Sequence, residues 1–139
     1  MELKKKAEIL ADFIKFCKDA IEIDKLPKIQ FIKDLKWAQQ HKTFGEYKNN
    51  SKSLVVYIGN RNLADICRTL AHELTHHKQN ELGLLYAKSG KTGSSIENDA
   101  HDVAGIVMRN YGQIQPLIYE SKNKVTKNEK RNKSKKRVL

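Results

Sequence analysis

Residues 71–76 read Ala71-His72-Glu73-Leu74-Thr75-His76, and this short stretch decides how the rest of the chain is interpreted. Two histidines four positions apart lie one turn apart on the same face of an α-helix, so both imidazoles can reach one metal ion. Glu73 follows the first histidine, so its carboxylate lies beside the ion, where it can take a proton from water held by the metal. The pattern therefore predicts His72 and His76 as metal ligands and Glu73 as a general base.

The residues around this stretch predict the helix that the metal site requires. Asn62 can cap its start, Asp65 places a negative charge in the first turn, and Gly83 is a natural stop. Its apolar face would carry Leu63, Cys67, Leu70, Ala71 and Leu74. The alternative is a helix whose histidines and glutamate only make surface contacts, because a pattern with three fixed positions also occurs by chance.

An open catalytic zinc site takes a third protein ligand, and Glu97 is the first candidate. It lies 21 residues after His76, near the start of a second helix that we expect to begin at Ser94 or Ser95. Ala100 is small enough to let the two helices approach closely. The alternative is a capping box, in which Glu97 only satisfies a backbone N–H beside Ser94. The weaker ligand candidates are Asp99, His101, Asp102 and His41.

The sequence before the motif predicts one helix and a small sheet. Over residues 2–21 the apolar side chains recur three or four positions apart, as on one face of an amphipathic helix. We expect strands at 29–32 and 53–58, and a strand with turns somewhere within 36–47. Cys17 and Cys67 fall at apolar helical positions, which favours buried thiols over a disulfide.

The motif His72-Glu73-Leu74-Thr75-His76 with the downstream Glu97-x-x-Ala100 resembles the gluzincin metallopeptidases. The order of the expected elements is similar to a minimal zincin domain of the α+β class, with an N-terminal helix, a small mixed sheet, an active-site helix and a glutamate helix over residues 1–119. The resemblance implies one zinc ion bound by His72, His76 and Glu97, and peptide-bond hydrolysis with Glu73 as general base. It also implies a protein or peptide substrate that pairs with an edge strand at 53–58.

The chain departs from this family just after Ala100. Many relatives have an aspartate there, whereas this sequence has His101, with Asp102 one position further on. The residue that orients a zinc-bound histidine therefore stays open between Asp99, His101 and Asp102. Candidates for stabilising the transition state are Tyr86, His77 and His101, although we expect His77 to face solvent.

Residues 120–139 form a basic tail that we expect to be disordered. The formal charge of the chain is +11, and residues 121–139 contribute +8 of it, from nine Lys or Arg and one Glu. Such a tail could bind nucleic acid without sequence preference, or simply keep the protein soluble. The candidate nucleic-acid-binding residues are Lys130, Arg131, Lys133, Lys135, Lys136 and Arg137.

Two classes of function follow from the sequence. The first is a zinc metallopeptidase; the alternative is a non-catalytic zincin-fold or nucleic-acid-associated binding protein that uses the basic tail. The presence of Glu73 favours the first, because a purely structural zinc site needs no general base. We expect an intracellular, cytoplasmic protein with no membrane partner, because the sequence shows neither a signal peptide nor a long apolar run. The compact single-domain form also resembles hypothetical proteins of tailed phages, so a phage-encoded protein is one expectation.

Overall fold

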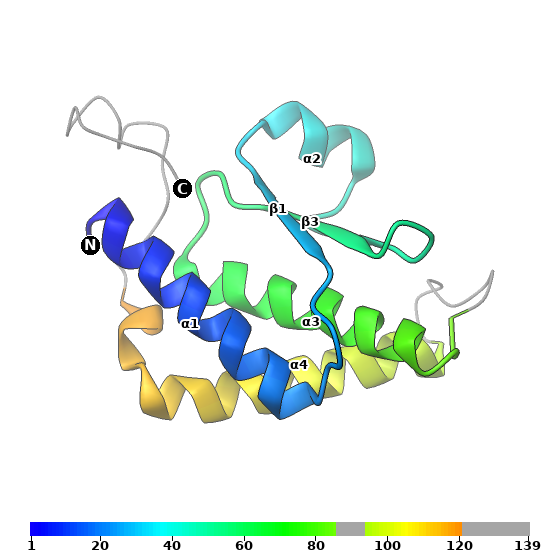
Figure 1. Cartoon of the computed structure of the whole chain (residues 1–139). Helices are drawn as coiled ribbons and strands as arrows, with labels where there is room; N and C mark the ends of the chain where they lie inside the picture. The colour runs from blue at the N-terminus through cyan, green and yellow to red at the C-terminus, as the bar shows by residue number, and fades with distance from the viewer. Residues whose placement is uncertain (86–93, 121–139) are drawn as a thin grey trace.

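A small sheet separates one short helix from three long helices (Figure 1). The computed structural model describes residues 1–85 and 94–120, and over this part of the chain the protein has an α+β fold, as predicted. The long helices are α1 (Leu3–Ile21), α3 (Leu63–Glu81) and α4 (Ser95–Ile114). The short helix α2 (Leu35–His41) lies on the other face of the sheet, and the 3-10 helix η1 (Pro116–Tyr119) follows α4.

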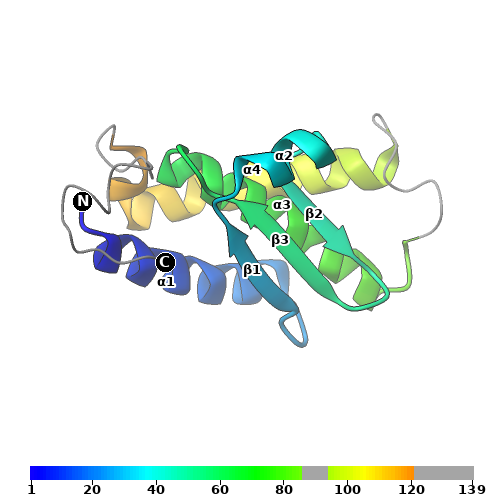
Figure 2. The same cartoon turned by 90° about the horizontal axis from the view of Figure 1, so that it is seen from above.

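The sheet contains the strands β1 (Lys28–Ile32), β2 (Gly45–Lys48) and β3 (Ser53–Tyr57) in the order β1-β3-β2. β1 runs parallel to β3 and β2 runs antiparallel to it (Figure 2). The strand expected at 53–58 is therefore present, but it is the central strand and not an edge. Because both of its sides are already paired, the predicted pairing of a substrate with this strand is wrong; the edges of the sheet are β1 and β2.

The prediction of a strand within 36–47 is correct only for its last part. Asp34 accepts a hydrogen bond from the backbone N–H of Lys36, and this cap starts α2 where a strand had been the expectation. Lys42 adopts a left-handed conformation, with φ of 55°, and ends the helix. The chain then enters β2 at Gly45.

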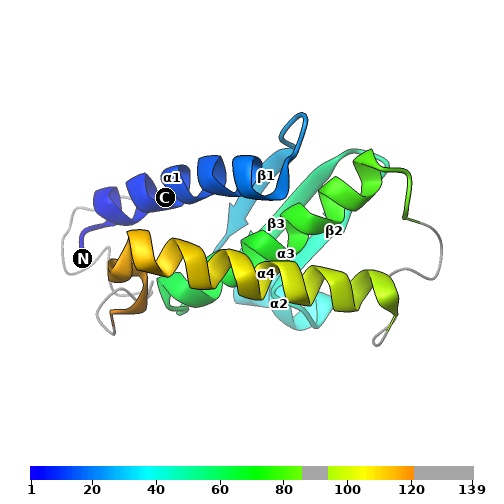
Figure 3. The ribbon, with the colours of Figure 1, turned by 90° about the horizontal axis from the view of Figure 1, so that it is seen from below.

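Helix α3 lies at the centre of the molecule, between the sheet and the helices α1 and α4 (Figure 3). Apolar side chains from α1, β3, α3, α4 and η1 meet around it in one core. The largest fully buried members of that core are Phe13, Leu54, Ile58, Leu63, Ile66, Leu70, Leu74, Met108, Tyr111 and Ile118. Cys17 and Cys67 are both buried and free, which confirms the prediction made for them.

The predicted ends of α3 are correct, although one cap works differently. Asn62 occupies the N-cap position, but its side chain makes no capping hydrogen bond. Gly83 follows the helix with φ of 74°, a conformation that glycine adopts without steric cost. Over residues 1–85 and 94–120, no helix combines the length and the apolarity needed to cross a membrane.

Candidate metal centre

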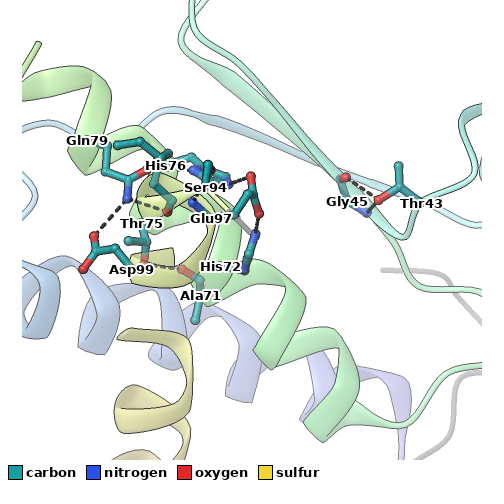
Figure 4. Close-up of polar contacts among 11 residues, drawn as sticks. Thr43, Gly45, Ala71, His72, Thr75, His76, Gln79, Ser94, Glu97 and Asp99 are labelled. Carbon is teal, nitrogen blue, oxygen red and sulfur yellow. Dashed lines mark hydrogen bonds and ion pairs between the residues drawn. The ribbon is translucent and has the colours of Figure 1, made fainter. Parts of the chain in front are cut away.

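The first turn of α4 lies beside the part of α3 that carries the two histidines of the motif (Figure 4). One carboxylate oxygen of Glu97 is 3.0 Å from Nε2 of His72, and the other is 3.0 Å from Nε2 of His76. The three ligand atoms lie within 4.8 Å of one another, and together they could hold one metal ion. The structure thus brings together the three residues that the sequence predicted as ligands.

The capping role and the ligand role of Glu97 turn out to be compatible. The Ser94 hydroxyl accepts a hydrogen bond of 3.1 Å from the backbone N–H of Glu97, which is the cap of α4. The Glu97 side chain meanwhile contacts the two histidines. Ala100, one turn further along α4, is fully buried, as expected for a residue that allows close packing of the helices.

Gln79 holds the far side of the His76 ring, a role that sequence reasoning missed. Its amide nitrogen donates to the Ile96 carbonyl at 3.1 Å and to the Asp99 carboxylate at 2.9 Å. Its amide oxygen therefore faces Nδ1 of His76, at 2.7 Å, and that nitrogen must carry the hydrogen. The sequence did carry a signal for this contact, because Gln79 lies three residues after His76 and residues three apart on a helix are neighbours.

This arrangement tests whether the site fits a metal ion. With its hydrogen on Nδ1, a neutral His76 points the lone pair of Nε2 at the Glu97 carboxylate, 3.0 Å away. Two acceptors at that distance repel each other unless the ring is protonated or a cation lies between them. Two imidazoles and one carboxylate form a donor set that zinc prefers. The residues present therefore fit a metal ion.

The electrostatics of His72 agree with a role as neutral ligand. Burial lowers its pKa, and the neighbouring His76 lowers it further, while Glu97 acts in the opposite direction. A metal ligand must be the unprotonated imidazole, so a lowered pKa favours the binding form.

Glu73 is buried between α3 and β2, with 7% of its surface exposed. Within the described part of the chain, its carboxylate has no hydrogen-bond donor as partner. Burial raises its pKa to about 8, and the charges of Glu97 and Glu46 add to this effect. A buried carboxylate without partners is costly, and such groups concentrate at functional sites.

The close approach of Glu73 to β2 depends on Gly45, which the sequence analysis did not single out. A Cβ added at this glycine would lie 2.6 Å from Cγ2 of Thr69 and 2.9 Å from Oε2 of Glu73. Only a glycine leaves room for the carboxylate here. Strand β2 therefore forms the wall of the site next to the predicted general base.

The other candidates of the sequence analysis are dispersed. Asp99 contacts Gln79 and thus reaches His76 only indirectly. The exposed ring of His101 packs against His72, with the ring centroids 4.8 Å apart, so an orienting or stabilising role remains a prediction. Asp102 is exposed and does not belong to the ligand group, and neither does His41, which stacks on Trp37. Tyr86 and the basic residues Lys130, Arg131, Lys133, Lys135, Lys136 and Arg137 lie outside the described residues.

The prediction that His77 faces solvent is wrong, because this side chain is buried, with 2% of the residue exposed. Its Nε2 donates to the Lys25 carbonyl at 2.6 Å, and its Nδ1 accepts from the Tyr47 hydroxyl at 2.7 Å. The Tyr47 hydroxyl in turn accepts from the Asn80 amide. His77 thus ties α3 to β2 and to the segment before β1, on a different side of α3 from the candidate metal ligands.

No protein-family model matches the chain, and neither a curated protein nor a solved structure matches it. The functional argument therefore rests on the site itself.

Proposed function

We propose that the protein is a zinc-dependent metallopeptidase. The observation that carries the proposal is the contact of one Glu97 carboxylate with Nε2 of both His72 and His76, directly beside the buried Glu73. This combination supports a catalytic site more than a structural one, since three protein ligands leave a position open and a fourth residue is available as base. It also agrees with the resemblance to the gluzincins.

In this proposal the metal ligands, Glu73 and Gln79 have separate roles. His72, His76 and Glu97 hold the ion, which when bound would activate a water and polarise the carbonyl of the scissile bond. Glu73 takes a proton from the attacking water and later gives it to the leaving amine. Gln79 keeps the hydrogen of His76 on Nδ1, so that Nε2 stays free for the ion.

The edge strand β2 supports a peptide as substrate. The Phe44 carbonyl accepts from the N–H of Tyr57, so Phe44 directs its polar groups toward β3. Neighbouring residues of a strand alternate, and Gly45 and Tyr47 therefore direct their N–H and C=O away from the sheet. An extended peptide could pair with this edge of β2, next to Glu73. This pairing replaces the pairing with β3 that the sequence analysis expected.

The test begins with the zinc content of the purified full-length chain. We expect near-stoichiometric zinc in the wild type, and its loss or reduction in His76→Ala and Glu97→Ala. Asp99→Ala should weaken zinc binding less than Glu97→Ala, because Asp99 acts only through Gln79. The reverse order would assign the third ligand to Asp99.

Catalysis is tested with zinc-loaded protein and fluorescein-labelled casein, an unfolded substrate with many extended segments. The wild type should cleave it, while Glu73→Gln should keep zinc and lose turnover. Proteolysis that survives in this variant would remove Glu73 from the role of base. Stoichiometric zinc without any cleavage would favour the non-catalytic binding protein instead.

A further inference from the structure

The hydroxyl of Thr43 forms hydrogen bonds with both the carbonyl and the N–H of Gly45, which point away from the sheet (Figure 4). It donates a hydrogen bond of 2.9 Å to the Gly45 carbonyl, and it accepts one of 3.3 Å from the Gly45 N–H. Thr43 lies before the start of β2 and is exposed, whereas Gly45 is buried. A single side chain thus covers the first residue of this edge strand.

These two hydrogen bonds are the ones that a neighbouring strand would make. In an antiparallel pair, a residue of the partner strand donates its N–H to the carbonyl and accepts from the N–H of the residue opposite. The Thr43 hydroxyl does both with one oxygen atom. Because the Gly45 N–H has a single hydrogen to donate, an incoming backbone must compete with this hydroxyl for Gly45. The position matters because Gly45 is the residue of β2 that packs against Glu73.

We propose that Thr43 is a specificity-determining residue, whose hydroxyl competes with the backbone of an extended peptide for Gly45. This inference rests on the proposed function, because it assumes that substrate pairs with the outer edge of β2, where no strand lies among the described residues. A peptide that lies along Tyr47 alone leaves the hydroxyl in place. A peptide that reaches Gly45, beside the general base, displaces the hydroxyl by rotation of the Thr43 side chain.

Removal of the hydroxyl should therefore strengthen substrate binding. Thr43→Val keeps the branched shape of the side chain and loses both hydrogen bonds to Gly45. We expect its apparent KM for an unfolded protein to fall roughly threefold to tenfold, the size that corresponds to one or two hydrogen bonds. Thr43→Ser retains a hydroxyl and should retain the wild-type KM.

The experiment uses the full-length, zinc-loaded chain, fluorescein-labelled casein, and the wild type, Thr43→Val and Thr43→Ser in parallel. A lower KM in Thr43→Val alone, with kcat within about twofold of the wild type, supports the competition. An unchanged or higher KM in Thr43→Val, with or without a lower melting temperature, would mean that Thr43 only stabilises the turn before β2. That result overturns the inference and leaves the proposed peptidase function unaffected. Absence of cleavage by all three zinc-loaded proteins overturns the proposed function and this inference with it.

Discussion

The side-chain oxygen of Gln79 lies 2.7 Å from Nδ1 of His76, and this contact determines which nitrogen of the imidazole is available to a metal. Gln79 cannot reverse its amide without breaking two other bonds, because its nitrogen donates to Ile96 and to Asp99. The side chain is almost fully buried, with 2% of the residue exposed. One residue of α3 thereby couples the first turn of α4 to a predicted zinc ligand.

The first prediction concerns Gln79→Leu, which keeps most of the volume and removes the acceptor for the His76 N–H. The ring then loses its fixed orientation, so we expect zinc affinity to fall about tenfold to a hundredfold, as for other residues that orient ligands. A titration against a competing chelator measures this. Arg68→Ala, an exposed change on the same helix, is the control and should leave the affinity unchanged. Equal affinities in Gln79→Leu and wild type would deny Gln79 any role at the site.

The sequence was sufficient to predict the cluster of His72, His76 and Glu97, because the placement of these residues follows local rules. Spacing along α3 places His72 and His76 on one face, and the Ser94 cap fixes where α4 starts, which sets the position of Glu97. The helices α1, α3 and α4 were predictable for the same reason, since their apolar periodicity is long and regular.

The parts that sequence reasoning missed depend on contacts across the fold. The order of the strands is decided by which edges pair, and the only local signal for it is the unbroken apolar run of 54–58, which is typical of a strand buried on both faces. His77 looked like a surface residue because its partners, Tyr47 and Lys25, are 30 and 52 residues away. The role of Gly45 follows only from the approach of α3 to β2.

The second prediction concerns the pH dependence of the zinc-free protein. The pKa of Glu73 rises from its ordinary value of 4.5 to about 8 in the fold, so the folded state binds a proton more tightly than the unfolded state. The resulting stability is complete below about pH 4.5 and is lost as the pH rises through about 8. Thermal unfolding in a chelator should show Glu73→Gln close to wild type at pH 5 and more stable than wild type at pH 9. A difference that does not change with pH would contradict the burial of this carboxylate.

The third prediction concerns Tyr47→Phe, which removes the hydroxyl that bridges His77 and Asn80. Nδ1 of the buried His77 would lose its partner, and an unsatisfied buried group costs about 1–3 kcal/mol of unfolding free energy. Denaturant unfolding measures the loss. Zinc affinity should hardly change, because His77 is not one of the proposed ligands. The control is Tyr119→Phe, which removes one hydrogen bond of 3.3 Å from an exposed side chain and should cost less than about 1 kcal/mol.

The last prediction compares two glycine substitutions. Gly45→Ala places a methyl group 2.6 Å from Thr69 and 2.9 Å from Glu73, so we expect about 1–3 kcal/mol of destabilisation and a displaced carboxylate. Gly105→Ala meets no atom within 4 Å inside α4 and should stabilise the protein by about 0.5–1 kcal/mol. Thr69→Ser removes Cγ2, the closest obstacle, and keeps the hydroxyl that accepts from Arg61, so the double variant Gly45→Ala with Thr69→Ser should regain part of the loss in denaturant unfolding. If Gly45→Ala were as harmless as Gly105→Ala, β2 would not lie against Glu73, and the wall of the proposed active site would have to be sought elsewhere.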